Sequence, residues 1–155
     1  MRLSDLAGPD AIIPSLKARS KKQVLQELAG FAATITGQEE RAICDVLMKR
    51  ERLGTTGVGQ GVAIPHGKLK GLDKIHGVFA RLESSVDFEA LDDQPVDLIF
   101  MLLVPEDAGA DHLKALARIS RLLRDQDVCE KLRGSDSADA IYALLSESES
   151  AAFAA

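Results

Sequence analysis

The amino-acid sequence predicts a three-layer α/β/α domain, in which a mixed sheet of about five strands lies between two layers of helices. Three observations favour this α/β class. The segment "PVDLIFMLLVP" (95–105) is an almost unbroken apolar run, typical of a central strand covered on both faces. Apolar residues recur with helical spacing over residues 20–53 and again over the last third of the chain. Short strand patterns fall between these stretches, and such an order places a sheet between helices.

The first elements are a strand and two helices. The segment "AIIPSL" (11–16) is expected to form an edge strand, because Pro14 cannot donate a ladder hydrogen bond. The helix over 20–37 opens with a Ser and a Gln in capping-box spacing and closes at Gly37. The second helix covers about 38–53 and stops at Gly54. The residues expected on the buried faces are Val24, Leu25, Leu28, Ala32 and Ile35 in the first helix, and Ile43, Val46, Leu47 and Leu53 in the second.

The middle of the chain changes from helical to strand patterns. The loop "GTTGVGQG" (54–61) holds four glycines in eight residues, and "VAIP" (62–65) follows it as a short strand. The segment "HGVFARLESSVDF" (76–88) alternates over part of its length and predicts a strand with a turn.

The last third of the chain is helical. The helix "DHLKALARISRLLRD" (111–125) is expected to bury one face, and shorter helices follow at about 127–133 and 136–146. The residues expected on that face are Leu113, Leu116, Ala117 and Leu123. With neither a repeat nor a linker, residues 1–148 are expected to form a single domain, and the polar tail 149–155 is expected to fray.

Composition excludes several function classes. The chain of 155 residues carries a formal charge of −5 and no basic run, so nucleic acid is not an expected partner. It has no apolar run of about 20 residues and no secretory signal, so we expect a cytoplasmic protein that does not insert into the membrane. Cys44 and Cys129 match no metal or redox spacing and are expected to be packing residues. The three histidines show no metal-ligand spacing either, so no metal or cofactor is expected.

His66 is the first candidate for chemistry. It stands directly after the strand "VAI", in the region where open α/β sheets bind ligands. Pro65 stiffens the backbone before it, and Gly67 is expected to leave room for another molecule beside the imidazole. From these residues alone, a plain turn histidine with no task remains an equal alternative.

His112 and Arg50 are the other candidates. If the strands ending at Pro65 and Pro105 run parallel, His112, in the first turn of its helix, emerges at the same sheet edge as His66. The two imidazoles could then surround a phosphoryl group, one as nucleophile and the other as hydrogen-bond donor. Taken alone, His112 is better interpreted as a surface residue of the helix turn.

Arg50 continues the apolar stripe of the second helix, so it is expected to face inward toward an anion. The alternative is a cation that complements the end of its own helix, and Arg52 takes the place of Arg50 if the helix phase differs.

The glycine loop could bind phosphate through its backbone N–H groups and the hydroxyls of Thr55 and Thr56. A nucleotide-binding module is therefore a second class of function. The order here is helix, loop, strand, however, which differs from the strand–loop–helix order of dinucleotide sites. The third histidine, His76, receives no role.

The segments "RERLGTTGVGQGVAIPHGK", "LDDQPVDLIFMLLVPE" and "DHLKALARISRLLRD" closely resemble the IIA domain of the fructose/mannitol class of the phosphotransferase system. The resemblance is nearest to the nitrogen branch of that family and covers about residues 4–146. It implies that His66 accepts a phosphoryl group, with Nε2 as the candidate atom, that His112 hydrogen-bonds it, and that Arg50 neutralises its charge. The residues expected to support this site are Thr55, Thr56, Gly59, Pro65 and Gly67.

The resemblance also implies partners. The donor would be an HPr-like phosphocarrier protein, and the chain would act as a phosphocarrier and regulator without small-molecule turnover of its own. Its targets would be proteins such as potassium-transport or sensor-kinase components. The alternative is a sugar-specific component that passes phosphate to a IIB domain. An apolar docking rim is expected from Val58, Val62, Leu69 and Leu72.

Overall fold

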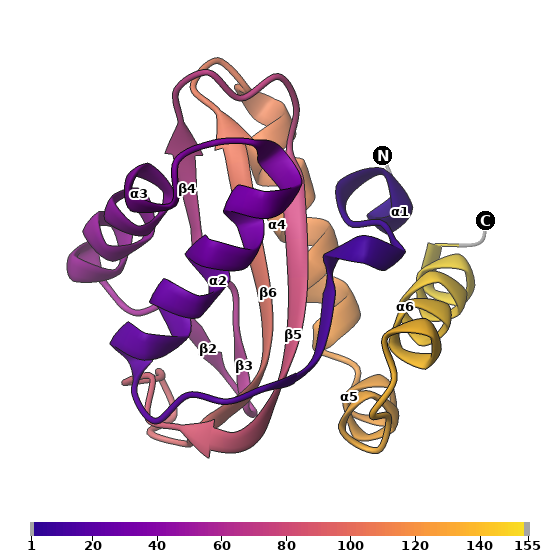
Figure 1. Ribbon diagram of the computed structural model, residues 1–155. Helices are drawn as coiled ribbons and strands as arrows, with labels where there is room; N and C mark the ends of the chain where they lie inside the picture. The colour runs from indigo at the N-terminus through magenta and orange to yellow at the C-terminus, as the bar shows by residue number, and fades with distance from the viewer. Residues whose placement is uncertain (1, 154–155) are drawn as a thin grey trace.

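A mixed sheet organises the fold, as Figure 1 shows, and the predicted α/β class is confirmed. The computed structural model describes residues 2–153, with the side chains of residues 2–150. Within this part of the chain the sheet has six strands. They are β1 (Ile12–Leu16), β2 (Gly57–Gly59), β3 (Val62–Ala63), β4 (His66–Leu69), β5 (His76–Val86) and β6 (Val96–Pro105). Strands β2 and β4 were not anticipated, because a glycine-rich loop and a Pro-His-Gly sequence lack the β-branched residues that indicate a strand.

The strands run in the order β1-β5-β6-β3-β2, and β4 also pairs with β6. Strand β6 is parallel to β3 and β4 and antiparallel to β5, while β1 is parallel to β5. Every residue of β6 from Leu98 to Pro105 is buried, as expected of a central strand. Strand β5 is a single strand of eleven residues, and the turn expected within it is absent.

Helices cover both faces of the sheet. Figure 1 shows α2 and α3 in front of the sheet and α4 behind it, with α5 and α6 continuing from α4 toward β1. The helices are α1 (Leu3–Leu6), α2 (Lys21–Thr36), α3 (Glu40–Leu53), α4 (Ala110–Leu123), α5 (Gln126–Arg133) and α6 (Ala138–Phe153), with a short 3₁₀ helix at Pro9–Ala11.

The boundaries of α2 follow the local sequence. Ser20 caps its start by accepting a hydrogen bond from the Gln23 N–H, and Gly37 ends it in the left-handed conformation with φ of 74°. Four residues of the predicted stripe are buried, namely Val24, Leu25, Leu28 and Ala32. Ile35, the fifth, lies near the helix end and is 36% exposed.

The predicted buried faces of α3 and α4 are partly wrong. In α3 the buried row is Ile43, Leu47 and Glu51, whereas Leu53 is 83% exposed. In α4 the buried row is Ala115, Ile119, Leu122 and Leu123, whereas Leu113 and Ala117 are exposed. The buried faces keep their large apolar residues, but Glu51 in α3 and Ala115 in α4 lie on them, whereas Leu53 and Leu113 do not.

Helix α6 extends further than expected. It runs to Phe153, and Glu149 is buried, where it accepts hydrogen bonds from the Leu3 N–H at 2.9 and 2.8 Å. Residue 149 is therefore held in place. Fraying of the rest of the tail stays a prediction, and its last residues, 154–155, lie outside the described part of the chain.

Candidate functional site

His66 lies in an extended run that follows β6 from residue 62 to residue 69. The same register offset relates Ala63 to Ile99 in β3 and His66 to Leu102 in β4. The run is interrupted only at Ile64 and Pro65, where proline has no N–H to donate to β6. The expectation that His66 stands beyond the end of a strand is therefore wrong, since His66 begins β4, three residues before the end of β6 is reached.

The His66 ring is oriented by its own backbone. Its Nδ1 lies 2.8 Å from the carbonyl oxygen of Ile64. A carbonyl oxygen can only accept, so Nδ1 must carry the proton, and Nε2 of the neutral ring keeps its lone pair. The arrangement presents Nε2 as the nucleophilic atom of a half-buried imidazole.

His112 lies beside His66, as the predicted parallel pairing of the two strands requires. Their ring centroids are 5.5 Å apart and the ring planes meet at 64°. His112 is in the first turn of α4, close to the positive end of that helix. Its Nε2 is buried and has no hydrogen-bond partner among the described residues, an arrangement that costs free energy unless a ligand completes it.

Arg50 lies near His66 at the end of α3. Its Nη1 donates to the Gly54 carbonyl at 2.9 Å, so it also complements the end of its own helix, as the alternative reading held. Arg52 is exposed and lines a different hollow, with Lys22 and Glu89. Of the two arginines, Arg50 is the one whose charge acts on His66.

Both histidines are held neutral. Burial lowers the pKa of His66 below its ordinary value of 6.5 and the charge of Arg50 lowers it further, against the hydrogen bond to Ile64 and the charge of Glu51. Burial also lowers the pKa of His112; the positive charge that His66 carries when its ring is protonated, and the charge of Lys68, act in the same direction. A neutral imidazole is the form that can act as a nucleophile.

The glycine loop forms a hairpin rather than a phosphate cradle. Three of its N–H groups already have acceptors: Thr56 N donates to Glu51, Gly57 N to the Thr55 hydroxyl, and Gln60 N to Asp92. Thr55 in turn donates to the Phe88 carbonyl at 2.8 Å. Because these groups are satisfied within the chain, the hairpin offers little to a nucleotide phosphate.

The expected supporting residues have different surroundings. Gly59 adopts φ of 108° at the end of β2, away from the two imidazoles and against Asp92. The Pro65 carbonyl accepts a hydrogen bond from Leu102 N at 2.9 Å, which ties this position to β6. Gly67 is buried, and a Cβ there would overlap the Val46 side chain of α3. Gly67 therefore serves the close approach of α3 to β4, and the idea that it leaves room beside the imidazole is wrong.

The expected apolar rim is also corrected. Val62, Leu69 and Leu72 are buried in the core, and only Val58 of the four is exposed, at 50%. Leu113, which directly follows His112, is 68% exposed. Leu113 is thus the exposed apolar residue next to His112 in the sequence, although helical periodicity had predicted it to be buried.

Glu51 is a residue of this region that sequence reasoning missed. It is buried, accepts hydrogen bonds from Thr56 and forms an ion pair with Lys21 at 2.8 Å. Its signal was the spacing of four from Ile43 and Leu47, which places a carboxylate on a buried row. The two cysteines, by contrast, pack as predicted, and burial raises the pKa of both thiols.

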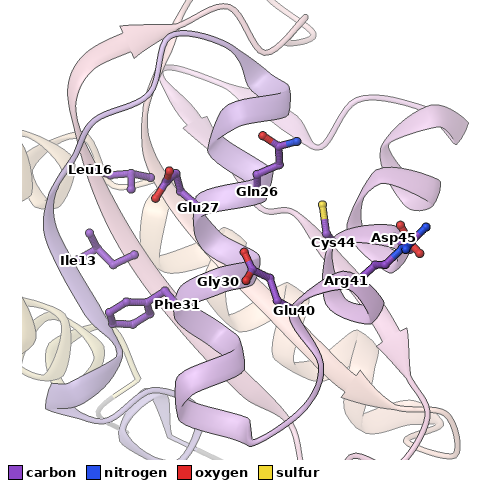
Figure 2. Close-up of a pocket in the computed structure, with 10 residues that line it drawn as sticks. All are labelled: Ile13, Leu16, Gln26, Glu27, Gly30, Phe31, Glu40, Arg41, Cys44 and Asp45. Carbon is purple, nitrogen blue, oxygen red and sulfur yellow. The ribbon is translucent and has the colours of Figure 1, made fainter.

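A surface hollow of about 880 Å³ lies elsewhere, between β1, α2 and α3 (Figure 2). It combines apolar side chains with the carboxylates of Glu27, Glu40 and Asp45, and neither imidazole lines it. Among the described residues, no group of three or more His, Cys, Asp or Glu side chains could hold a metal ion. Over the same residues, no helix has the length and apolarity needed to cross a bilayer.

Comparison with known proteins places this geometry in a family. The family model described as "Phosphoenolpyruvate-dependent sugar phosphotransferase system, EIIA 2" matches residues 6–148. A nitrogen regulatory protein of Bradyrhizobium diazoefficiens is 66% identical over 145 residues, which cover 94% of this chain and 95% of the relative. A fructose-specific EIIA component of Haloferax volcanii is 41% identical over 125 residues, which cover 81% of this chain and 80% of the relative.

A solved structure supports the same assignment. The crystal structure of the nitrogen regulatory protein IIA-Ntr from Neisseria meningitidis superposes with a TM-score of 0.87 and 34% identity, covering 92% of this chain and 98% of that one. The nitrogen regulatory relatives therefore match more of the chain, and the first of them at higher identity, than the fructose-specific one. The chain belongs to the EIIA 2 family of the phosphoenolpyruvate-dependent sugar phosphotransferase system, and of the relatives named here it is more similar to the nitrogen regulatory protein than to the fructose-specific component.

Proposed function

We propose that this protein carries a phosphoryl group on Nε2 of His66 and regulates target proteins according to its phosphorylation state. The donor is the phosphorylated histidine of an HPr-like carrier protein. The observation that carries the proposal is the hydrogen bond between His66 Nδ1 and the Ile64 carbonyl, which leaves Nε2 as the free nucleophile of a neutral ring. Membership of the EIIA 2 family supports it, since that family takes part in phosphotransfer.

The transfer exchanges one nitrogen–phosphorus bond for another. The lone pair of His66 Nε2 attacks the phosphorus, and the bond to the donor histidine breaks with its electron pair remaining on the donor nitrogen. Each ring keeps its own proton, which on His66 stays at Nδ1 against Ile64. Because no proton crosses, the protein's task is to align Nε2 with the donor and to stabilise the phosphoryl charge.

His112 and Arg50 supply that stabilisation. The buried Nε2 of His112 has no partner in the part of the chain that the structure describes, so a hydrogen bond to the phosphoryl oxygens would satisfy it. The start of α4 adds a favourable partial charge. Arg50 would exchange its bond to Gly54 for one to the phosphoryl group or hold both, since a guanidinium has five N–H donors.

Regulation follows from the charge. A phosphoryl group adds about −1.5 to −2 charges at neutral pH. On a surface where Leu113 is exposed beside His112, such a charge weakens docking of an apolar partner and favours a basic one. Potassium-transport and sensor-kinase components are classes of target that would read this change, and an HPr-like carrier must dock at the same surface.

Phosphorylation by purified components tests the proposal. Incubation with enzyme I, an HPr-like protein and phosphoenolpyruvate should place one acid-labile phosphate on the wild type and on His76→Ala, a matched control at a histidine outside the site. His66→Ala should take up none, and His112→Ala should be slower by on the order of 100-fold. Label on His66→Ala equal to the wild type would reject the acceptor assignment.

The sugar-specific alternative keeps His66 as acceptor but passes the phosphate to a cysteine of a IIB domain. The 41% identity to a fructose-specific EIIA component is the observation in its favour. Adding a IIB domain to the phosphorylated protein distinguishes the two functions. Rapid and complete transfer would favour the alternative, while phosphate that stays on His66 favours the regulatory function.

A further inference from the structure

The backbone beside His66 contains half of an antiparallel hydrogen-bonded pair. Gly57 lies opposite Ala63, so the next opposed residues are Thr56 and Ile64. Ile64 N donates to the Thr56 carbonyl at 3.0 Å, which identifies the pair as the type that exchanges two hydrogen bonds. The reciprocal bond, from Thr56 N to the Ile64 carbonyl, is not made.

Glu51 takes the Thr56 N–H instead. Its Oε1 accepts from Thr56 N at 2.7 Å, and its Oε2 accepts from the Thr56 hydroxyl at 2.7 Å. The carboxylate is 6% exposed and is paired with Lys21 Nζ at 2.8 Å, while Lys21 also lies over the Phe88 ring. The hydrogen bonds from Thr56 to Glu51 are therefore charge-assisted and shielded from water.

The Ile64 carbonyl is thereby left for His66. In a strand the N–H and C=O of one residue point to the same side, so the Ile64 carbonyl faces away from β6, toward Thr56. On the other side of it, the Pro65 carbonyl is held by Leu102 N. Fixed on both sides and unused by Thr56, the Ile64 carbonyl accepts from His66 Nδ1.

We propose that Glu51 is a positioning residue for His66: by binding the Thr56 N–H, it reserves the Ile64 carbonyl for Nδ1 and so holds the ring with Nε2 free. The inference rests on the proposed acceptor role of His66. Without an acceptor from residue 51, the buried Thr56 N–H completes the ladder with the Ile64 carbonyl and competes with Nδ1. A carbonyl oxygen can accept two hydrogen bonds, so the His66 ring then shares this acceptor, and the bond that selects its tautomer weakens.

Nitrogen NMR of the His66 ring tests this in the unphosphorylated protein. The wild type should show the Nδ1–H tautomer as the dominant form, with a scalar coupling across the bond to the Ile64 carbonyl. Glu51→Ala should bring the two tautomers to comparable populations and slow phosphorylation by the HPr-like carrier about tenfold. Glu51→Asp, which withdraws the carboxylate by one methylene, should shift the tautomers in the same direction, and it serves if Glu51→Ala does not fold.

Two further variants separate positioning from stability and charge. Glu51→Gln can accept from Thr56 N through its amide oxygen and donate to the hydroxyl, so it should restore the wild-type tautomer without the charge. Glu149→Ala removes a comparable buried, ion-paired carboxylate, whose partners are Leu3 and Arg118, and should lower stability while leaving the tautomer unchanged.

An unchanged His66 tautomer in both Glu51→Ala and Glu51→Asp, or a wild type without the Nδ1–H form, would overturn the inference. Because the tautomer is read without any phosphate, these results stand apart from the fate of the proposed function. Failure of the wild type to take up phosphate would reject that function alone.

Discussion

At the scale of the residue, the proposed chemistry depends on one imidazole kept neutral and in one tautomer. A carbonyl of the protein's own backbone, two residues before the histidine, selects the tautomer, and no carboxylate bonds to the ring among the described residues. A carboxylate partner would raise the pKa of the ring, whereas burial and Arg50 lower the pKa of His66. The geometry therefore favours a nucleophile that is ready without deprotonation, and neutral at the pH of most cells.

The pH dependence of His66 follows from this lowered pKa. The neutral form is the nucleophile, so its fraction is full above the folded pKa and is lost only as the pH falls through a value below the ordinary 6.5. We expect the His66 Cε1–H resonance of the isolated protein to titrate at lower pH than in an unfolded peptide of the same local sequence. A midpoint equal to or above that of the peptide would contradict the expectation.

At the scale of the element, the position of α3 against β4 depends on the absence of a side chain at residue 67. We expect Gly67→Ala to reduce the free energy of unfolding by about 1–3 kcal/mol, because its Cβ would overlap Val46 and force α3 outward. Denaturant unfolding measures the effect. The cost should shrink in a Val46→Ala background, and Gly8→Ala, which meets open space, should change stability by less than about 0.5 kcal/mol.

If the cost of Gly67→Ala were the same with and without Val46, the two residues would not be coupled and the packing explanation would fail. The rate of phosphorylation provides a second measurement, because Arg50 also lies on α3. Outward movement of α3 takes its guanidinium away from His66, so transfer should slow as well.

The elements of this fold follow from the sequence more securely than the faces that they bury. The caps of α2 and the apolar run of β6 are local signals, and both elements lie where these signals place them. Which residues complete the buried faces of α3 and α4 is not set locally: Glu51 is buried because Thr56 and Lys21 surround it, and Leu113 is exposed beside His112. A spacing pattern ranks residues by polarity, whereas these positions are decided by partners from other segments.

The candidate site shows the same division. His66 and His112 lie side by side because β4 and β6 run parallel, and the sequence predicted this neighbourhood on condition that the strands are parallel. Other features of the site depend on where atoms lie to within a few tenths of an ångström. They are the hydrogen bond between His66 Nδ1 and Ile64, the hydrogen bonds from Thr56 to Glu51, and a His112 nitrogen without a partner among the described residues. No propensity or spacing encodes such distances, so these features required the structure.

At the scale of the whole molecule, Glu149 joins the two ends of the described chain. From α6 it accepts from the Leu3 N–H in α1 with both oxygens, and it lies 3.3 Å from Arg118 Nε of α4. We expect Glu149→Ala to destabilise the protein by about 1–3 kcal/mol, because a buried N–H loses its acceptor. Amide hydrogen exchange at Leu3 should accelerate, while phosphorylation of His66 should keep its wild-type rate.

The control for this prediction is Glu147→Ala, an exposed glutamate on the same helix, which should leave Leu3 exchange unchanged. Unaltered protection of Leu3 in Glu149→Ala would show that packing of α1 alone holds the N-terminal segment. Either result concerns the edge of the sheet formed by β1. The strands β2 and β3, which lead to the site, lie at the other end of the strand order.

The Ile64 carbonyl also links His66 to the stability of the fold. It points toward Thr56 within the β2–β3 hairpin, in a buried residue, and a buried carbonyl without a donor costs free energy. The His66 Nδ1–H supplies that donor, so the imidazole satisfies a backbone group in addition to presenting Nε2. An alanine at residue 66 removes both, and variants that keep a side-chain donor, such as His66→Asn, are the better choice when phosphate uptake alone is to be abolished.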